Sequence, residues 1–122
     1  MSLALLHAAF AAGGGLGAVA RHALGRLVVH RFPLATLLVN VLGSLILGAA
    51  LVTANGSADA IGPAPHRLVI GFCGGFTTFS SFAIQSLALR EAHSVTHLLA
   101  NVAINLASCL IAFRAGAMLF GA

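Results

Sequence analysis

Charged residues divide the chain into four long segments that are almost entirely apolar. Uncharged stretches cover residues 1–20, 32–58, 68–89 and 92–113. A helix that crosses the hydrocarbon core of a membrane needs about 20 residues, and each stretch is long enough. The pattern therefore predicts an all-α membrane protein of one domain, residues 1–122. Its four transmembrane helices should lie near residues 3–24, 33–54, 67–89 and 95–119.

Small and polar residues interrupt the third of these segments. Gly74 and Gly75 are followed, after one residue, by Thr77 and Thr78, and glycine and β-branched residues are weak helix formers. A break here would leave backbone groups that protein, water or an ion must satisfy. Non-helical backbone at membrane depth is typical of transport sites. The local sequence alone supports a kinked packing helix equally well.

Polar side chains fall at helical spacing on three of the four segments. The stripes are Thr78, Ser81 and Gln85 in the third segment, Asn40 and Ser44 in the second, and Asn101, Asn105 and Ser108 in the fourth. Asparagine within a span often joins neighbouring helices by hydrogen bonds, so one stripe by itself indicates little. Stripes on three segments favour a polar path through the membrane.

The composition argues against a soluble enzyme. Hydrophobic residues make up 60% of the chain and charged residues 7%, whereas soluble domains carry about 25% charged residues. The formal charge of +4 comes from scattered arginines set against Asp59 and Glu91, and no cluster could follow a nucleic-acid backbone. Because no Ser-His-Asp or Cys-His arrangement stands out either, we expect neither catalysis nor nucleic-acid binding.

The polar groups inside the spans offer hydrogen-bond donors without a carboxylate. No Asp or Glu lies inside a predicted span, and a proton-coupled pump normally needs one there. Asn amides, Ser and Thr hydroxyls and the positive edges of Phe rings are present, and Arg21 adds a cation near a membrane end. This set suits an anion. Carbonyl oxygens freed at a helix break would instead suit a cation, held at one point.

A glycine-rich run lies within the first segment. Gly13 and Gly17 are four residues apart, and small residues at this spacing let helix backbones approach closely in lipid. A phosphate-binding loop would need a preceding strand and a basic residue to hold the anion. We therefore predict that these glycines pack against another helix.

Two histidines flank the start of the fourth predicted helix. His93 and His97 are four residues apart, a spacing at which two imidazoles on a helix can share a metal ion. The sequence offers no evident third ligand. Histidines at the membrane interface are therefore the favoured interpretation.

Three stretches of the sequence together resemble a known family. They read Gly-Ala-Val-Ala-Arg at 17–21, Leu-Val-Asn-Val-Leu-Gly-Ser at 38–44, and Gly-Phe-Cys-Gly-Gly-Phe-Thr-Thr-Phe-Ser-Ser-Phe at 71–82. In these stretches, and in length and helix count, the chain resembles the small bacterial fluoride channels of the Fluc or CrcB family. Phe76 and Ser81 depart from the usual Leu and Thr, and Gln85 stands where many members carry Glu.

The resemblance implies a fluoride-selective channel that exports cytoplasmic fluoride passively and confers fluoride resistance. It implies an antiparallel, dual-topology homodimer with two fluoride pores, embedded in the lipid of the bacterial inner membrane. The implied pore residues are Arg21, Asn40, Phe79, Ser80, Ser81, Phe82 and Ser108. The family's central structural sodium ion would be held by the main-chain oxygens of Gly74 and Thr77.

Two other functional hypotheses are alternatives to a channel. A small four-helix multidrug or cation antiporter can also form antiparallel dimers, but it would need an intramembrane carboxylate. A membrane assembly protein without transport activity would explain the glycines and asparagines, but not the clustered break. The arginines give a weak bias toward an outside amino terminus under the positive-inside rule. We therefore expect both orientations of one chain, paired antiparallel, with a heterodimer of oppositely biased chains as the alternative.

Overall fold

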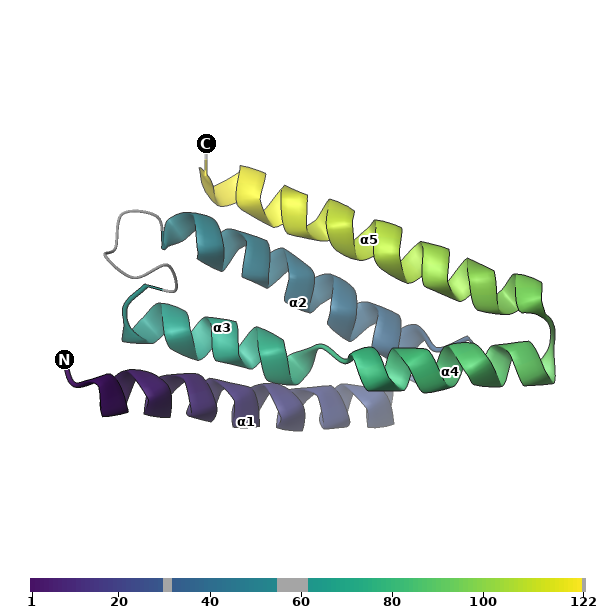
Figure 1. The fold of residues 1–122 in the computed structure, drawn as a ribbon, viewed down its shortest axis with the longest axis horizontal. Helices are drawn as coiled ribbons and strands as arrows, with labels where there is room; N and C mark the ends of the chain where they lie inside the picture. The colour runs from purple at the N-terminus through teal and green to yellow at the C-terminus, as the bar shows by residue number, and fades with distance from the viewer. Residues whose placement is uncertain (30–31, 55–61, 122) are drawn as a thin grey trace.

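The computed structural model describes residues 1–29, 32–54 and 62–121, and in these ranges the chain is helical with short connections. The helices are α1 (Leu3–Leu27), α2 (Leu34–Thr53), α3 (Ala64–Phe76), α4 (Phe79–Ala92) and α5 (Val95–Gly121) (Figure 1). Four segments are long and apolar enough to cross a membrane: α1, α2, α3 with α4, and α5. The predicted all-α architecture with four spans is confirmed. The first and third spans each extend about one turn beyond the predicted residues.

Polar and proline residues explain where several helices begin. The side chain of Ser2 accepts a hydrogen bond from the backbone N–H of Leu5 at the start of α1. Pro63 immediately precedes α3, where a missing N–H is tolerated. Ser94 precedes α5, and its hydroxyl oxygen lies 3.4 Å from the backbone nitrogen of His97, which donates to it. These contacts satisfy backbone groups that would otherwise lack partners at a helix end.

The third span consists of two helices with different neighbours. Thr77 and Thr78 lie in extended conformation between α3 and α4. Helix α3 packs mainly against α1, whereas α4 packs mainly against α5, and α2 contacts both (Figure 1). The two extended residues therefore let the chain change its helical partner part-way across the bundle.

Glycines allow the closest helix contacts. Gly13 and Gly17 are buried on the face of α1 that meets α3. A Cβ atom on Gly17 would collide with the carbonyl oxygen of Phe72, and one on Gly48 of α2 would collide with that of Phe113 on α5. Close backbone approach through small residues is typical of helix pairs in lipid. The predicted packing role of Gly13 and Gly17 is confirmed.

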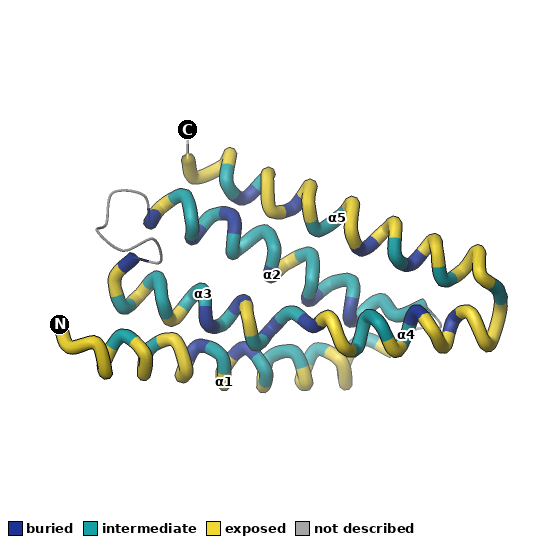
Figure 2. The backbone as a smooth tube through the Cα atoms, in the orientation of Figure 1, coloured by how far each residue is buried: buried dark blue, intermediate teal, exposed yellow. Residues whose placement is uncertain are grey.

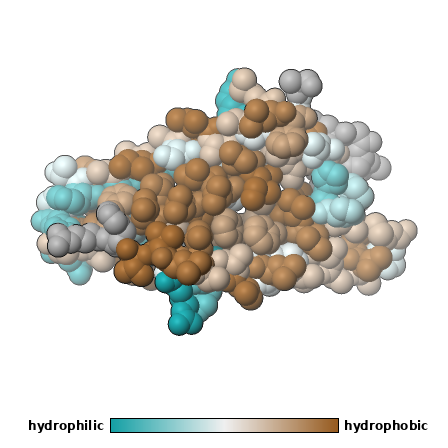
Figure 3. Space-filling model, turned by 180° about the vertical axis from the view of Figure 1, so that it is seen from behind, coloured by the Kyte–Doolittle hydropathy of each residue, from teal (hydrophilic) through white to brown (hydrophobic). Residues whose placement is uncertain are grey.

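Most large apolar side chains face outward. Buried positions form a narrow interior stripe along the helices, and exposed positions lie on their outer faces (Figure 2). Val19 and Ile111 are 69% and 70% exposed. Apolar residues dominate the centre of one face, while hydrophilic residues lie toward its ends and edges (Figure 3). Such a surface is costly in water and suits the hydrocarbon core of a bilayer.

Candidate functional site

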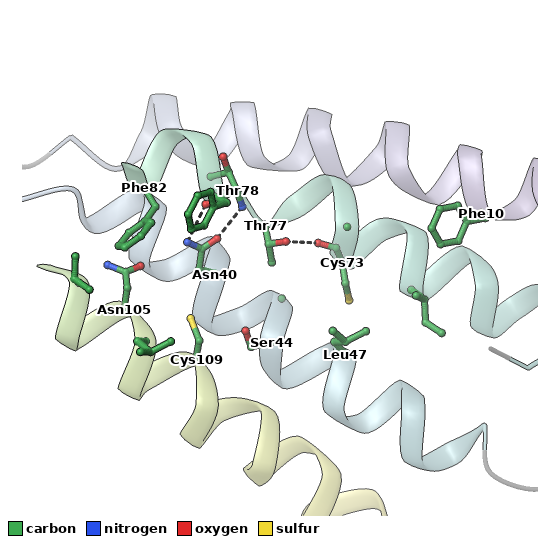
Figure 4. A pocket seen from close by; sticks show the side chains of 16 residues that line it. Phe10, Asn40, Ser44, Leu47, Cys73, Thr77, Thr78, Phe82, Asn105 and Cys109 are labelled. Carbon is green, nitrogen blue, oxygen red and sulfur yellow. Dashed lines mark hydrogen bonds between the residues drawn. The ribbon is translucent and has the colours of Figure 1, made fainter. Parts of the chain in front are cut away.

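An open-sided cavity of 760 Å³ lies beside the interruption between α3 and α4 (Figure 4). Its wall includes five of the residues predicted from the sequence: Asn40, Gly74, Thr77, Phe79 and Phe82. Residues of α2, α3, α4 and α5 all contribute to this wall. The fold therefore brings together side chains from separate spans around the non-helical backbone.

Asn40 of α2 binds the extended backbone directly. Its amide oxygen accepts a hydrogen bond from the backbone N–H of Thr78 at 2.8 Å, and its amide nitrogen donates to the carbonyl oxygen of Thr78 at 3.2 Å (Figure 4). One amide thus replaces both hydrogen bonds that a helix would have given this residue. Asn40 also lines the cavity.

The interruption also leaves carbonyl oxygens without their helical donors. The backbone N–H of Thr78, which would bond Gly74 in a continuous helix, is diverted to Asn40. The N–H and hydroxyl of Thr77 both donate to the carbonyl of Cys73. Within the described part of the chain, no hydrogen bond reaches the carbonyl oxygens of Gly74 and Thr77. Both residues line the cavity, so these oxygens are free to act as ligands.

Opposite ends of two helix dipoles meet at this interruption. Helix α3 ends at Phe76 and α4 begins at Phe79, so a carbonyl terminus with partial negative charge faces an N–H terminus with partial positive charge. The guanidinium of Arg21 lies at the carbonyl terminus, where its Nε donates to the carbonyl oxygen of Gly75 at 3.1 Å. The arrangement can hold a cation at α3 and an anion near α4.

Two phenylalanine rings border the cavity at the start of α4. The ring centroids of Phe79 and Phe82 lie 5.7 Å apart, and the rings are inclined by 52°. Phe79 is 79% exposed, so little of its ring is covered by the rest of the chain. Because the edges of aromatic rings carry partial positive charge, this pair can present weak donors to an anion in the cavity.

A second cavity, of 460 Å³, lies on the arginine-bearing side of the interruption. Arg21, Arg26, Ser81 and Gln85 contribute to its wall, and Thr78 lines both cavities. No acidic side chain belongs to the described wall, so its charge favours anions. The amide oxygen of Gln85 is buried and has no hydrogen-bond partner among the described residues.

Two predicted pore residues lie outside the walls of both cavities. Ser80 is exposed, and its hydroxyl lies 3.4 Å from that of Thr78. Ser108 is half-buried on α5. Its helix presents Asn105 and Cys109 to the first cavity instead. Helical spacing explains this difference. Around the helix axis, Ser108 is rotated about 60° from Asn105, whereas Cys109 is rotated only about 40° in the opposite direction.

A buried polar network connects α5 to the second phenylalanine. The amide of Asn105 donates to Asn101 at 3.0 Å, and Asn101 donates to the hydroxyl of Ser86 at 2.8 Å. Ser86 in turn donates to the carbonyl of Phe82 at 2.7 Å. Asn101 is fully buried. The sequence analysis did not single out Ser86, although its position one helical turn after Phe82 was a signal.

Breaking this network should destabilise the protein measurably. We expect Ser86→Ala to lower the free energy of unfolding by about 1–3 kcal/mol, because the buried amide of Asn101 loses its acceptor. Thermal unfolding in detergent measures the change. The Ser86→Ala, Asn101→Leu double variant should be less destabilised than the sum of the two single variants. Additive effects would contradict a direct coupling.

Comparison with known proteins identifies the family to which this chain belongs. A model described as "CrcB-like protein, Camphor Resistance (CrcB)" matches residues 8–117. The chain belongs to the CrcB-like family. It is 44% identical over 115 residues to the "Fluoride-specific ion channel FluC 2" of Natronomonas pharaonis, which covers 93% of this chain and 94% of the relative.

Other relatives with the same kind of name match this chain over a similar share of its length. The "Fluoride-specific ion channel FluC 2" of Symbiobacterium thermophilum is 44% identical over 115 residues, covering 89% of this chain and 92% of its own length. The "Fluoride-specific ion channel FluC" of Saccharophagus degradans is 38% identical over 115 residues, covering 88% and 86%. Together with the four apolar spans, membership of the CrcB-like family makes this chain a multi-pass membrane protein.

Proposed function

We propose that this protein is a fluoride-selective channel that exports fluoride passively from the cytoplasm. The observation that carries the proposal is the helix interruption, where the positive end of α4, the amide of Asn40 and the Phe79–Phe82 pair border one cavity. The names of the CrcB-like relatives agree with it.

The donor set favours an anion that is small and strongly hydrated. Such an ion needs several donors at close range to replace its water, and amide N–H groups, hydroxyls and ring edges supply them. Neutral donors also release the ion, whereas a tight arginine cluster would retain it. Conduction requires this balance between binding and release. Arg21 and Arg26 sit in the neighbouring cavity, where they can concentrate anions before entry.

We further propose that a structural sodium ion binds the main-chain oxygens of Gly74 and Thr77. The N–H of Thr78 bonds Asn40 instead of the carbonyl of Gly74, and the N–H of Ser81 bonds the hydroxyl of Thr78 instead of the carbonyl of Thr77. Neutral oxygens suit a hard cation, and the carbonyl end of α3 adds negative potential. The ion would stabilise the non-helical backbone and stay in place while fluoride moves.

We propose that the protein forms an antiparallel homodimer of dual topology in the lipid of the cell membrane. In bacteria this is the inner membrane. The apolar cavity is open on one side, and Phe79 of its wall is 79% exposed. A second copy related by an axis in the membrane plane would cover this face and bring two interruptions together. Two oxygens from each chain would then surround one central sodium ion.

The antiporter alternative has no support in the chain. Coupled export of a cationic drug requires a carboxylate within a span. Glu91 lies one residue before the end of α4, at the turn that precedes α5. Neither cavity has an acidic residue in its described wall.

Fluoride efflux from liposomes tests the proposal. Purified protein should release fluoride from loaded vesicles and leave chloride inside, because the chloride ion is larger and gains less from closely spaced donors. Comparable fluxes of the two ions would refute fluoride selectivity. Flux by the unmodified chain would also show that Gln85 can replace the usual glutamate.

Substitution of the phenylalanines tests the role of the ring edges. Phe79→Ile and Phe82→Ile keep the bulk and remove the edge donors, so each should slow fluoride efflux at least about tenfold, the equivalent of about 1.4 kcal/mol. Phe120→Ile makes the same chemical change at the far end of α5, outside both cavities, and serves as the control. Unchanged flux in both cavity variants would assign the pair to packing alone.

A further inference from the structure

The turn between α4 and α5 carries a histidine pair that the proposed channel function does not use. We propose that His93 and His97 form a surface site for a late first-row divalent transition ion, such as Ni²⁺ or Cu²⁺. The imidazole rings lie with centroids 4.8 Å apart and planes inclined by only 27°. Both side chains are exposed, so an ion can reach them from water. This inference is independent of the ion that the channel conducts.

The geometry suits shared coordination of one ion. His93 terminates α4, and His97 lies in the first turn of α5, so the turn itself holds the rings side by side. A metal–nitrogen bond is about 2.0–2.1 Å long, and rings at this separation can direct one nitrogen each toward a common point. No third His, Cys, Asp or Glu joins the pair within the described ranges. Water would fill the remaining positions.

Ser94 provides the support that metal-binding histidines usually have. Its hydroxyl lies 2.9 Å from Nδ1 of His97. When Nδ1–H donates to this oxygen, Nε2 of His97 carries no proton and is free to bind an ion. A partner on the second ring nitrogen fixes both orientation and tautomer in this way, and its loss typically weakens metal binding by about 10–100-fold.

The side-chain charges at this turn balance, because Arg90 and Glu91 are adjacent, so the ligand type rather than the charge selects the ion. The formal charge of the chain is +4, and arginines line the wall of the second cavity. Glu91 is the one carboxylate side chain within the described residues, and it lies two positions before His93. Imidazole ligands favour Cu²⁺ and Ni²⁺ over Mg²⁺ or Ca²⁺, which defines the class of ion.

Titration of the tag-free, full-length protein in detergent with Ni²⁺ alone tests the site. Calorimetry should give one ion per chain. His93→Gln and His97→Gln should each weaken binding by at least about tenfold, since losing a ligand costs no less than losing its support. His22→Gln, which alters an exposed histidine on α1, should leave binding unchanged. Electron paramagnetic resonance with Cu²⁺ should show coupling to two imidazole nitrogens.

Variants at Ser94 test the geometry more finely. Ser94→Gly removes the hydroxyl at little cost to helix capping, and it should weaken Ni²⁺ binding at least about tenfold, whereas Ser94→Thr should retain it. Unchanged Ni²⁺ affinity in either His93→Gln or His97→Gln would overturn the proposal. Equal loss in His22→Gln, or copper coupling to a single nitrogen, would also overturn it. All of these positions are at least partly exposed, so misfolding is not expected.

Discussion

Asn40→Asp should abolish fluoride flux. The substitution keeps the oxygen that accepts from the N–H of Thr78 but places a second oxygen against the carbonyl of Thr78, where the amide now donates. It also adds a negative charge beside the proposed path. A charge about 4 Å from the ion costs about 4 kcal/mol at an effective dielectric constant of about 20. This corresponds to a reduction of about a thousandfold.

Vesicle efflux measures this loss, and Asn40→Ser is the matched control. Serine removes most of the contact with Thr78 but adds no charge, so a reduced yet measurable flux is expected. Size-exclusion profiles that match the unmodified protein would show that both variants are folded. If Asn40→Asp is folded and conducts normally, Asn40 only joins α2 to the backbone of Thr78.

Asn40 shows how one residue can connect packing to permeation. The Asn40 amide accepts the N–H of Thr78, which in a continuous helix would bond the carbonyl of Gly74. Helix α3 therefore stops at Phe76, and the carbonyl of Gly74 is left without a donor. The same interruption creates the N–H terminus of α4. A neutral amide therefore generates a site suited to a cation and a site suited to an anion, at an interruption where no carboxylate belongs to the described wall of either cavity.

The spans could be predicted because their signals are local, whereas the local signal in the third span could not distinguish an interruption from a kink. Twenty uncharged apolar residues are sufficient to predict a membrane-crossing helix, and the pairs Gly74–Gly75 and Thr77–Thr78 are weak helix formers. The partner of each helix has no such signal. That α1 packs on α3 and α2 on α5 depends on which glycines face each other, and hydrophobicity does not encode this.

The kinds of residue at the candidate site could be predicted from the sequence, but only some of their positions in the structure could. Helical spacing correctly grouped Asn101 with Asn105, yet it could not show that Asn101 turns to Ser86 of α4 while Asn105 reaches the cavity. The same limit applies to Ser108, whose place in the cavity wall is taken by Cys109. Spacing defines a face of a helix, and only the packing of the helices decides what that face meets.

Gly17→Ala should destabilise the protein, whereas Gly15→Ala should not. A methyl group on Gly17 would collide with the backbone carbonyl of Phe72, which cannot rotate away as a side chain could. Overpacking of this kind costs about 1–3 kcal/mol. The better helix propensity of alanine stabilises the helix by at most about 1 kcal/mol. The collision therefore dominates, and α1 must move away from α3.

Gly15 provides the matched control within the same glycine run. It is exposed on α1, and a Cβ atom there would meet nothing within 4 Å, so Gly15→Ala should be neutral or stabilising by up to about 1 kcal/mol. Thermal unfolding of both variants in the same detergent measures the contrast, and Gly17→Val should lower the midpoint further than Gly17→Ala. Equal midpoints for Gly15→Ala and Gly17→Ala would contradict close packing of α1 on α3. Because α3 leads directly into the interruption, Gly17→Ala should also slow fluoride efflux at temperatures where the protein remains folded.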